Sequence, residues 1–124
     1  MIVMRFQTYR SDKMASVMAV VDVEIRILKS NPVQWSITAH GVVGSGGWSN
    51  LRLEPRYYIS FPEDGIQDLD FVGDAPSGIA IQPILPVIGS ALWPDPPHYV
   101  KGVRVHSATN SVEKSIEEGL ELRL

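Results

Sequence analysis

Apolar and polar side chains alternate along two neighbouring segments, residues 17–27 and 33–39. A period of two is typical of a strand that buries one face and leaves the other in water. The turn residues of "KSNP" at 29–32 join the two segments, so the pattern predicts a hairpin. The predicted inward side chains of its first strand are Val17, Ala19, Val21, Val23, Ile25 and Ile27, and those of its second are Val33, Trp35, Ile37 and Ala39.

The alternation resumes over residues 51–61, after a stretch rich in glycine, and the apolar side of this strand consists of Leu51, Leu53, Tyr57, Ile59 and Phe61. Pro55 lies inside this run, and proline has no N–H for a strand ladder, so we expect an edge or bulged strand. "PEDG" at 62–65 predicts a tight turn. A shorter strand should follow it, with Leu69 and Phe71 pointing inward and Asp68 and Asp70 outward.

The second half of the chain is richer in proline. Pro83 and Pro86 interrupt the run "IAIQPILPVI" at 79–88, which indicates an edge element. "WPDPPH" at 93–98 predicts a stiff polyproline-like connector. The last clear strand covers 99–106, with Val103 and Val105 on one side and Arg104 and His106 on the other.

The tail supports two interpretations. "NSVEKSIEEGL" at 110–120 has an Asn-x-x-Glu start and apolar residues at helical spacing, which favours a short C-terminal helix. "LELRL" at 120–124 alternates like a strand.

Six to seven strands separated by turns, without βαβ alternation or internal repeat, predict an all-β fold. We expect an antiparallel immunoglobulin-like β-sandwich, with a small barrel as the competing architecture. The length of 124 residues suits one domain, which we place at 15–124. Residues 1–14 are interpreted as a poorly defined arm, with an additional edge strand over "IVMRFQTY" as the equal alternative.

Composition narrows the classes of function. The chain has 11 basic and 14 acidic residues and a net charge of −3, so we expect no nucleic acid partner. No apolar run approaches the roughly 20 residues of a membrane span, and no secretion signal is recognisable. The absence of cysteine excludes disulfides and thiolate chemistry. We therefore expect a soluble, cytoplasmic protein without contact with a membrane.

The glycine cluster at 44–47 precedes a strand with a proline in it, whereas phosphate-binding loops lead into a helix. We therefore interpret it as a strand connection, without a nucleotide cofactor. Trp48 at its end is either folded back on the sandwich, the favoured alternative, or an exposed anchor. This loop and the proline-rich connector contain the residue types that make contacts at interfaces. The candidate binding residues are Gly46, Gly47, Trp48, Trp93, His98 and Tyr99.

An acidic face offers a rival site. Asp68 and Asp70 share one side of a strand about 7 Å apart, which would suit a cation or an acid–base pair with a histidine nearby. The alternative interpretation is an ordinary polar strand face without a functional site, on which Arg52, Arg56 or Arg104 lies opposite these carboxylates. His40, His98 and His106 show no short spacing typical of zinc ligands, so we assign no metal site and no cofactor.

No catalytic constellation is recognisable, and we assign no catalytic residue. The leading hypothesis is a non-enzymatic module that binds a protein or peptide. One alternative is a small enzyme or metal-binding domain built on the face of Asp68 and Asp70. Another is a structural subunit that forms homo-oligomers through an edge strand.

Overall fold

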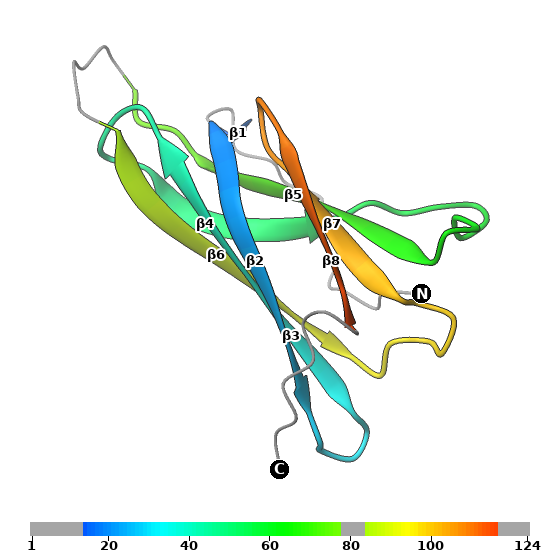
Figure 1. Cartoon of the computed structure of the whole chain (residues 1–124). Helices are drawn as coiled ribbons and strands as arrows, with labels where there is room; N and C mark the ends of the chain where they lie inside the picture. The colour runs from blue at the N-terminus through cyan, green and yellow to red at the C-terminus, as the bar shows by residue number, and fades with distance from the viewer. Residues whose placement is uncertain (1–13, 78–83, 117–124) are drawn as a thin grey trace.

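The computed structural model describes residues 14–77 and 84–116, and its regular elements are eight strands in two sheets (Figure 1). The strands are β1 (Met14–Ser16), β2 (Ala19–Leu28), β3 (Gln34–Val43), β4 (Ser49–Pro55), β5 (Ile66–Asp74), β6 (Leu85–Pro94), β7 (Gly102–His106) and β8 (Ser111–Ser115). The sheets pack face to face around one apolar core. The predicted all-β sandwich is thereby confirmed, with more strands than the six to seven expected.

β5 is the centre of the five-stranded sheet. β4 pairs with one edge of β5. Along the other edge, β7 pairs with the first half of β5 and β1 pairs with its last residues. β8 lies beyond β7 and pairs with it. The smaller sheet has the order β2-β3-β6, which leaves β6 at an edge as its prolines predict.

β5 and β7 form the one parallel pair among the described strands, and the other pairs are antiparallel. After β5 the chain crosses to the smaller sheet as β6 and returns as β7, so β7 runs in the direction of β5 (Figure 1). The parallel register places Asp68 beside Arg104 and Asp70 beside His106. Four polar side chains are thereby gathered on one outer face.

Phe71 of β5 fills the centre of the core, where its side chain is fully buried. Gly41 and Gly89 in the opposite sheet leave space for its ring, because a Cβ atom would lie 2.9 Å from the ring at Gly41 and 2.6 Å at Gly89. Further along the same sheet, Trp35 and Trp93 pack edge to face with their ring centroids 5.5 Å apart. Large rings therefore set the spacing between the two sheets.

A register shift between Val20 and Asp22 changes which side chains of β2 point inward. Val20 is 2% exposed and Val21 is 64% exposed. The prediction that Val21 points inward is wrong, because the extra residue of a bulge moves the alternation by one position. After the bulge, Val23 and Ile25 are buried as predicted.

The strand predicted at 51–61 is shorter than expected. β4 ends at Pro55, and the expected inward residues Tyr57 and Ile59 are 56% and 107% exposed. Proline cannot donate to the ladder with β5, and the chain leaves the sheet soon after it. The prediction holds up to Leu53, which is buried, and is wrong for Tyr57 and Ile59.

β6 continues to Pro94, so the connector predicted at 93–98 starts only after that residue. The helix predicted at 110–120 is wrong for Ser111–Ser115, which form β8. There Val112 pairs with Val105 of β7, and this pairing outweighs a weak helical pattern. Residues 1–13, 78–83 and 117–124 lie outside the described residues, and with them "LELRL" and all of the predicted arm except Met14, which begins β1. In the described part of the chain, no helix has the length and apolar character to cross a membrane.

Candidate functional site

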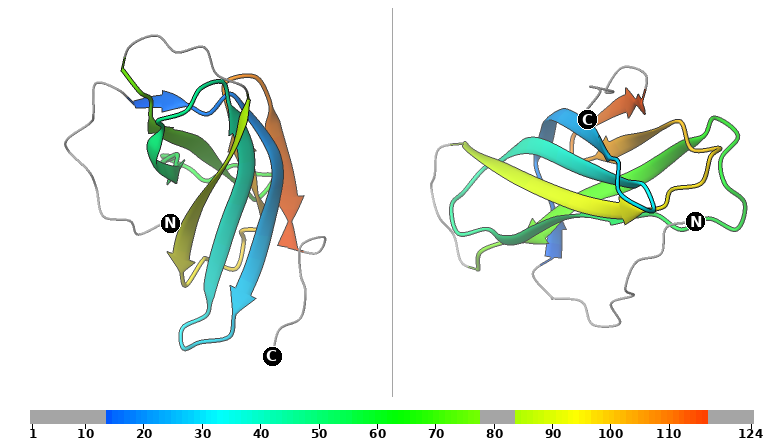
Figure 2. Two further views of the ribbon diagram at one scale, coloured as in Figure 1. Left: turned by 90° about the vertical axis from the view of Figure 1, so that its left-hand side faces the viewer. Right: turned by 90° about the horizontal axis from the view of Figure 1, so that it is seen from below.

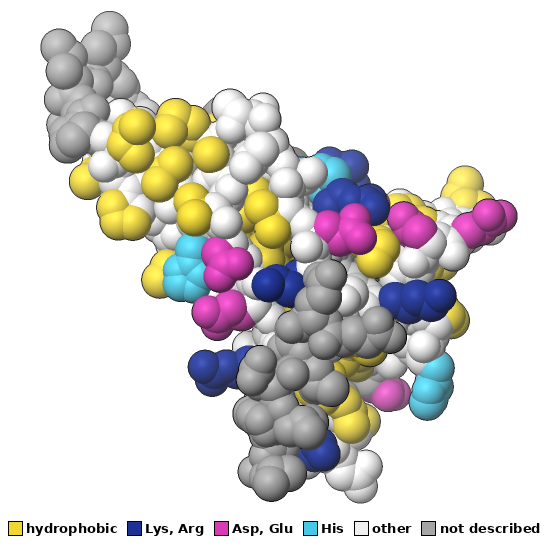
Figure 3. Space-filling view, viewed as in Figure 1, with side chains coloured by type: hydrophobic (Ala, Val, Ile, Leu, Met, Phe, Trp, Pro, Cys, Tyr) yellow, Lys and Arg dark blue, Asp and Glu magenta, His cyan; other side chains and the backbone are white. Residues whose placement is uncertain are grey.

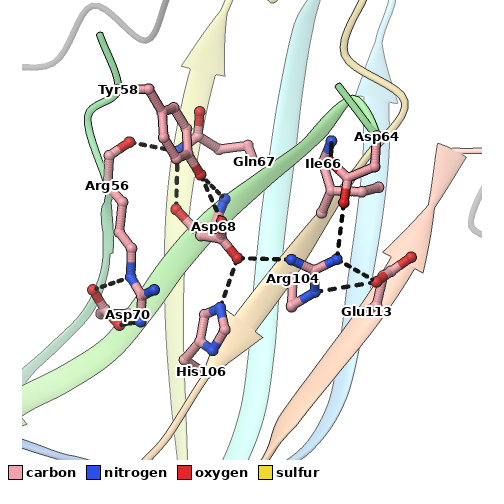
Figure 4. A network of polar contacts seen from close by, with 10 residues as sticks. All are labelled: Arg56, Tyr58, Asp64, Ile66, Gln67, Asp68, Asp70, Arg104, His106 and Glu113. Carbon is pink, nitrogen blue, oxygen red and sulfur yellow. Dashed lines mark hydrogen bonds and ion pairs between the residues drawn. The ribbon is translucent and has the colours of Figure 1, made fainter. Parts of the chain in front are cut away.

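Asp68 is the centre of a set of polar contacts on the outer face of the five-stranded sheet (Figure 4). Its Oδ1 lies 2.7 Å from His106 Nε2 and 3.1 Å from Arg104 Nη1. Its Oδ2 accepts a hydrogen bond from the Tyr58 hydroxyl at 2.8 Å. The same hydroxyl accepts one from the Asp68 backbone N–H at 2.7 Å. These residues, together with Asp64 and Glu113, are called the Asp68 network.

Arg104 connects the outer members of the Asp68 network. Its guanidinium is 2.9 Å from Glu113 and 3.3 Å from Asp64. Glu113 is placed there by the antiparallel register of β7 and β8, which pairs it with Arg104. Beside the network, Arg56 contacts both carboxylate oxygens of Asp70, at 2.8 and 3.1 Å. The predicted placement of arginines opposite these acids is confirmed for Arg56 and Arg104.

The surroundings of each group fix its charge near neutral pH. Burial of the Asp68 carboxyl raises its pKa, but hydrogen bonds from His106, Tyr58 and Arg104 outweigh burial, so the pKa is lowered overall. Burial is also the main reason that the pKa of Tyr58 is raised to about 12. The hydrogen bond to Glu113 raises the pKa of Arg104 above its ordinary value. Asp68 is therefore ionised, and Tyr58 keeps its proton.

The two carboxylates of this face are already engaged by neighbouring side chains. Both oxygens of Asp68 already accept hydrogen bonds, and both oxygens of Asp70 are held by Arg56. A general base needs a free lone pair within reach of a substrate proton. In residues 14–77 and 84–116, no group of three or more acidic or histidine side chains is placed to hold a metal ion.

Tyr58 also begins a stack of aromatic rings at one end of the sandwich. Its ring lies edge-on to Phe61, with centroids 5.4 Å apart, and Phe61 lies 5.1 Å from Tyr99. The stack joins the loop 56–65 to the loop 95–101, which are also linked by a 2.7 Å hydrogen bond from Lys101 N to the Gly65 carbonyl.

Gly65 permits this close approach of the two loops. Its φ is +76°, and a Cβ atom there would lie 2.9 Å from the Tyr99 carbonyl oxygen. Three large side chains of the paired loops are exposed: Tyr57 by 56%, Ile59 by 107% and Tyr99 by 54%. We call this region the aromatic end, and it consists of Tyr57, Tyr58, Ile59, Phe61 and Tyr99.

The candidate binding residues do not form one surface. His98 and Tyr99 are exposed near the aromatic end. Trp93 is 1% exposed and packs against Trp35, so its place among the candidate binding residues is wrong. It points inward because it pairs with Trp35 on the core-facing side of β6 and β3. Trp48 is half-buried and packs on the core, as the favoured alternative predicts.

The loop with Gly46 and Gly47 lies at the other end of the sandwich. It follows β3, whereas the 95–101 loop follows β6, and these strands are antiparallel. Ten paired positions, from Gln34 with Pro94 to Val43 with Leu85, separate the two loops, or about 30 Å. Gly47 instead faces Pro76, where its Cβ would lie 3.0 Å from the proline ring. The two loops therefore cannot form a common recognition surface.

Sequence reasoning missed Tyr58 and Phe61, because the alternation assigned them to a strand. Pro55 and the density of aromatic residues at 57–61 are the signals that could have identified an irregular aromatic loop. His106 belongs to the Asp68 network, whereas His40 lies on the other sheet, 3.9 Å from Glu24. No family model, curated protein or solved structure matches the chain.

Proposed function

We propose that this protein is a non-enzymatic β-sandwich module that binds a protein or peptide through the aromatic end. The observation that carries the proposal is the double role of Tyr58. Its hydroxyl is fixed by Asp68 and its ring supports Phe61, which in turn contacts Tyr99. The exposed side chains of Tyr57, Ile59 and Tyr99 thus belong to loops that these contacts fix to the sheet.

Rigid presentation favours binding because less conformational entropy is lost when a partner docks. Tyrosine supplies a large contact area with few rotatable bonds and is enriched at binding hot spots. Ile59, whose side chain is fully exposed, adds an apolar group that a partner's pocket would bury at a gain of about 1.5–3 kcal/mol. The expected partner presents apolar surface to these side chains.

The enzyme alternative relies on Asp68 and His106. The hydrogen bonds of Asp68 give it a simpler role, since its Oδ2 and its N–H both contact Tyr58. In this role the acidic face stabilises the aromatic end from within the sheet. A structural function for the Asp68 network accounts for all of its contacts without a substrate.

A displayed library of random peptides, selected against the immobilised protein, tests the proposal. We expect enriched peptides that contain apolar residues and whose affinity falls about tenfold or more in Tyr99→Ala and Ile59→Asp. Ile88→Lys, on the opposite sheet, is the matched control and should leave their affinity unchanged. Enriched peptides that bind both aromatic-end variants as tightly as the wild type would contradict the proposal.

A further inference from the structure

β2 is an edge strand of the smaller sheet, and it pairs with β3 on one side only. On its other side, the side chain of Asn110 hydrogen-bonds both the N–H and the carbonyl of Val20. No described residue hydrogen-bonds the free side of the stretch 23–27 that follows. A row of open backbone donors and acceptors can pair with an extended chain, and proteins generally cover it.

The chain leaves β8 at the end of the sandwich where β2 also ends. Ile116 N donates a hydrogen bond to the carbonyl of Lys101 in the loop 95–101. In the same loop, Asp95 N donates one to the carbonyl of Val33 in the turn after β2. β8 and β2 lie side by side and run in the same direction (Figure 2, left). Residues that follow Ile116 can therefore turn back and run antiparallel to β2.

We propose that the run "LELRL" at 120–124 covers the stretch 23–27 of β2 as an antiparallel strand of the same chain. Both segments have five residues. Residues 117–119 form the connection, which spans up to about 10 Å and so reaches the edge of a strand that packs beside β8. Gly119, opposite Leu28, permits the sharp reversal. Because the connection is short, the run has a high effective concentration at the edge.

The two faces of β2 restrict how this strand can lie. After the bulge, Val23 and Ile25 point into the core, whereas Glu24 and Arg26 point outward. Figure 3 shows acidic and basic side chains near one another over β2. In the run, three leucines alternate with one acid and one base. Pairings that keep the leucines on the core side differ by steps of two residues.

One pairing matches every position of the run. It places Glu121 opposite Arg26 and Arg123 opposite Glu24, and Asp22 has Arg123 as its diagonal neighbour. The inward pairs are all aliphatic: Leu120 with Ile27, Leu122 with Ile25 and Leu124 with Val23. A shift by two residues brings either two acids or two arginines opposite each other, which is destabilising. In both segments the acid precedes the base, so only antiparallel strands form both opposite-charge pairs.

The inward leucines also cover the opening between the two sheets. Ile27 of β2 and Val112 of β8 pack on the core but are only half-buried, and so is Ile116. These residues belong to the side of the sandwich where β2 and β8 meet. Burial of leucine side chains against them adds apolar contact to the backbone hydrogen bonds of the new strand. The edge and the opening beside it thus fit the same segment.

Disulfide formation tests this register directly, because the natural chain has no cysteine. Glu24→Cys with Arg123→Cys places two thiols opposite each other at a separation that a disulfide spans. Glu24→Cys with Glu121→Cys is two residues out of register and is the matched control. In dilute solution, the first pair should form an intramolecular disulfide at least about tenfold faster than the second. Equal rates would overturn the proposal, and so would a disulfide-linked dimer as the main product.

Hydrogen exchange of the backbone amides at 23–27 measures the pairing in the whole chain without added thiols. Leu122→Asp should speed exchange on the free side of β2 about tenfold or more. Arg123→Glu should speed it about threefold, and Arg123→Glu with Glu24→Arg should restore the rate to within about twofold. Unchanged exchange in β3 verifies that each variant is folded.

Ile59→Lys at the aromatic end should leave exchange at 23–27 unchanged, so both tests are independent of peptide binding. Exchange at 23–27 that stays at the wild-type rate in Leu122→Asp would overturn the proposal. A charge exchange that fails to restore the rate would contradict the register.

Discussion

The ring of Phe71 lies where a side chain at Gly89 would be, with its Cε1 atom 2.6 Å from the position of a Cβ. Phe71 belongs to the larger sheet and Gly89 to the edge strand of the smaller one. A backbone nitrogen, that of Arg52, also lies 3.3 Å from the same Cβ position. Neither the buried ring nor the backbone can yield without moving the sheets apart.

Gly89→Ala should therefore lower the free energy of unfolding by about 1–3 kcal/mol, as overpacking of a core does. Gly44→Ala is the matched control, because the nearest atom to its Cβ position is 3.9 Å away. Urea denaturation of the two variants measures the difference. Equal stabilities would mean that the sheets adjust freely at this point.

Trp93 should be sensitive to loss of volume. Its ring is 1% exposed and packs against Trp35, so Trp93→Ala should cost about 3–5 kcal/mol. Trp93→Phe keeps an aromatic ring and removes an indole Nε1 that has no hydrogen-bond partner among the described residues, and it should cost clearly less. Thermal denaturation by near-ultraviolet circular dichroism distinguishes the two. A small loss in the alanine variant would contradict the core position of this side chain.

Tyr58 should contribute stability that depends on pH in the alkaline range. Its pKa is raised from 10.0 to about 12 in the folded protein, so its contribution is fully present below pH 10 and is lost as the pH rises through 12. Tyr58→Phe should flatten stability between these values. It should also cost about 1–3 kcal/mol at neutral pH, because Asp68 loses two hydrogen bonds. Urea titrations at several pH values measure both effects.

Asp68 should contribute stability that depends on pH in the acidic range. The pKa of its carboxyl is lowered from 3.8 on folding, so the unfolded chain binds more protons in acid. Its stabilisation is present above that value and is lost as the pH falls through the lower pKa of the folded state. Asp68→Asn should be less stable than wild type at neutral pH, and the difference should shrink in acid. A difference that stays constant down to pH 2 would show that the hydrogen bonds do not depend on the carboxylate charge.

The sequence predicted the features that depend on local alternation. The inward positions of Trp35, Ile37 and Ala39 follow from a period of two, and the structure confirms them. The same parity placed Asp68 and Arg104 on outward faces. Parity gives the face of the sheet on which a side chain lies, but not which strand is its neighbour. The sequence therefore predicted that an arginine lies opposite Asp68, without identifying Arg104 as the one.

The aromatic end could not be predicted for that reason. Phe61 and Tyr99 are far apart in sequence and meet only because β5 and β7 run parallel, which brings the loops before both strands to the same end. The exposure of Val21 was missed because a bulge has no clear sequence signal. Trp93 was misplaced because a proline-rich context suggested a connector, whereas burial of its large ring favours continuing the strand.

The connection between β1 and β2 is held by the turn between β7 and β8. The backbone carbonyl of Val17 accepts a hydrogen bond from Ala108 N, and Asn110 bonds both the N–H and the carbonyl of Val20. These partners are about 90 residues apart in sequence. Contacts of such long range slow folding, because a large loop must close before they form. On a ribosome, the first strands must therefore wait for residues 107–110 to emerge, so the sandwich cannot close before that turn has been made.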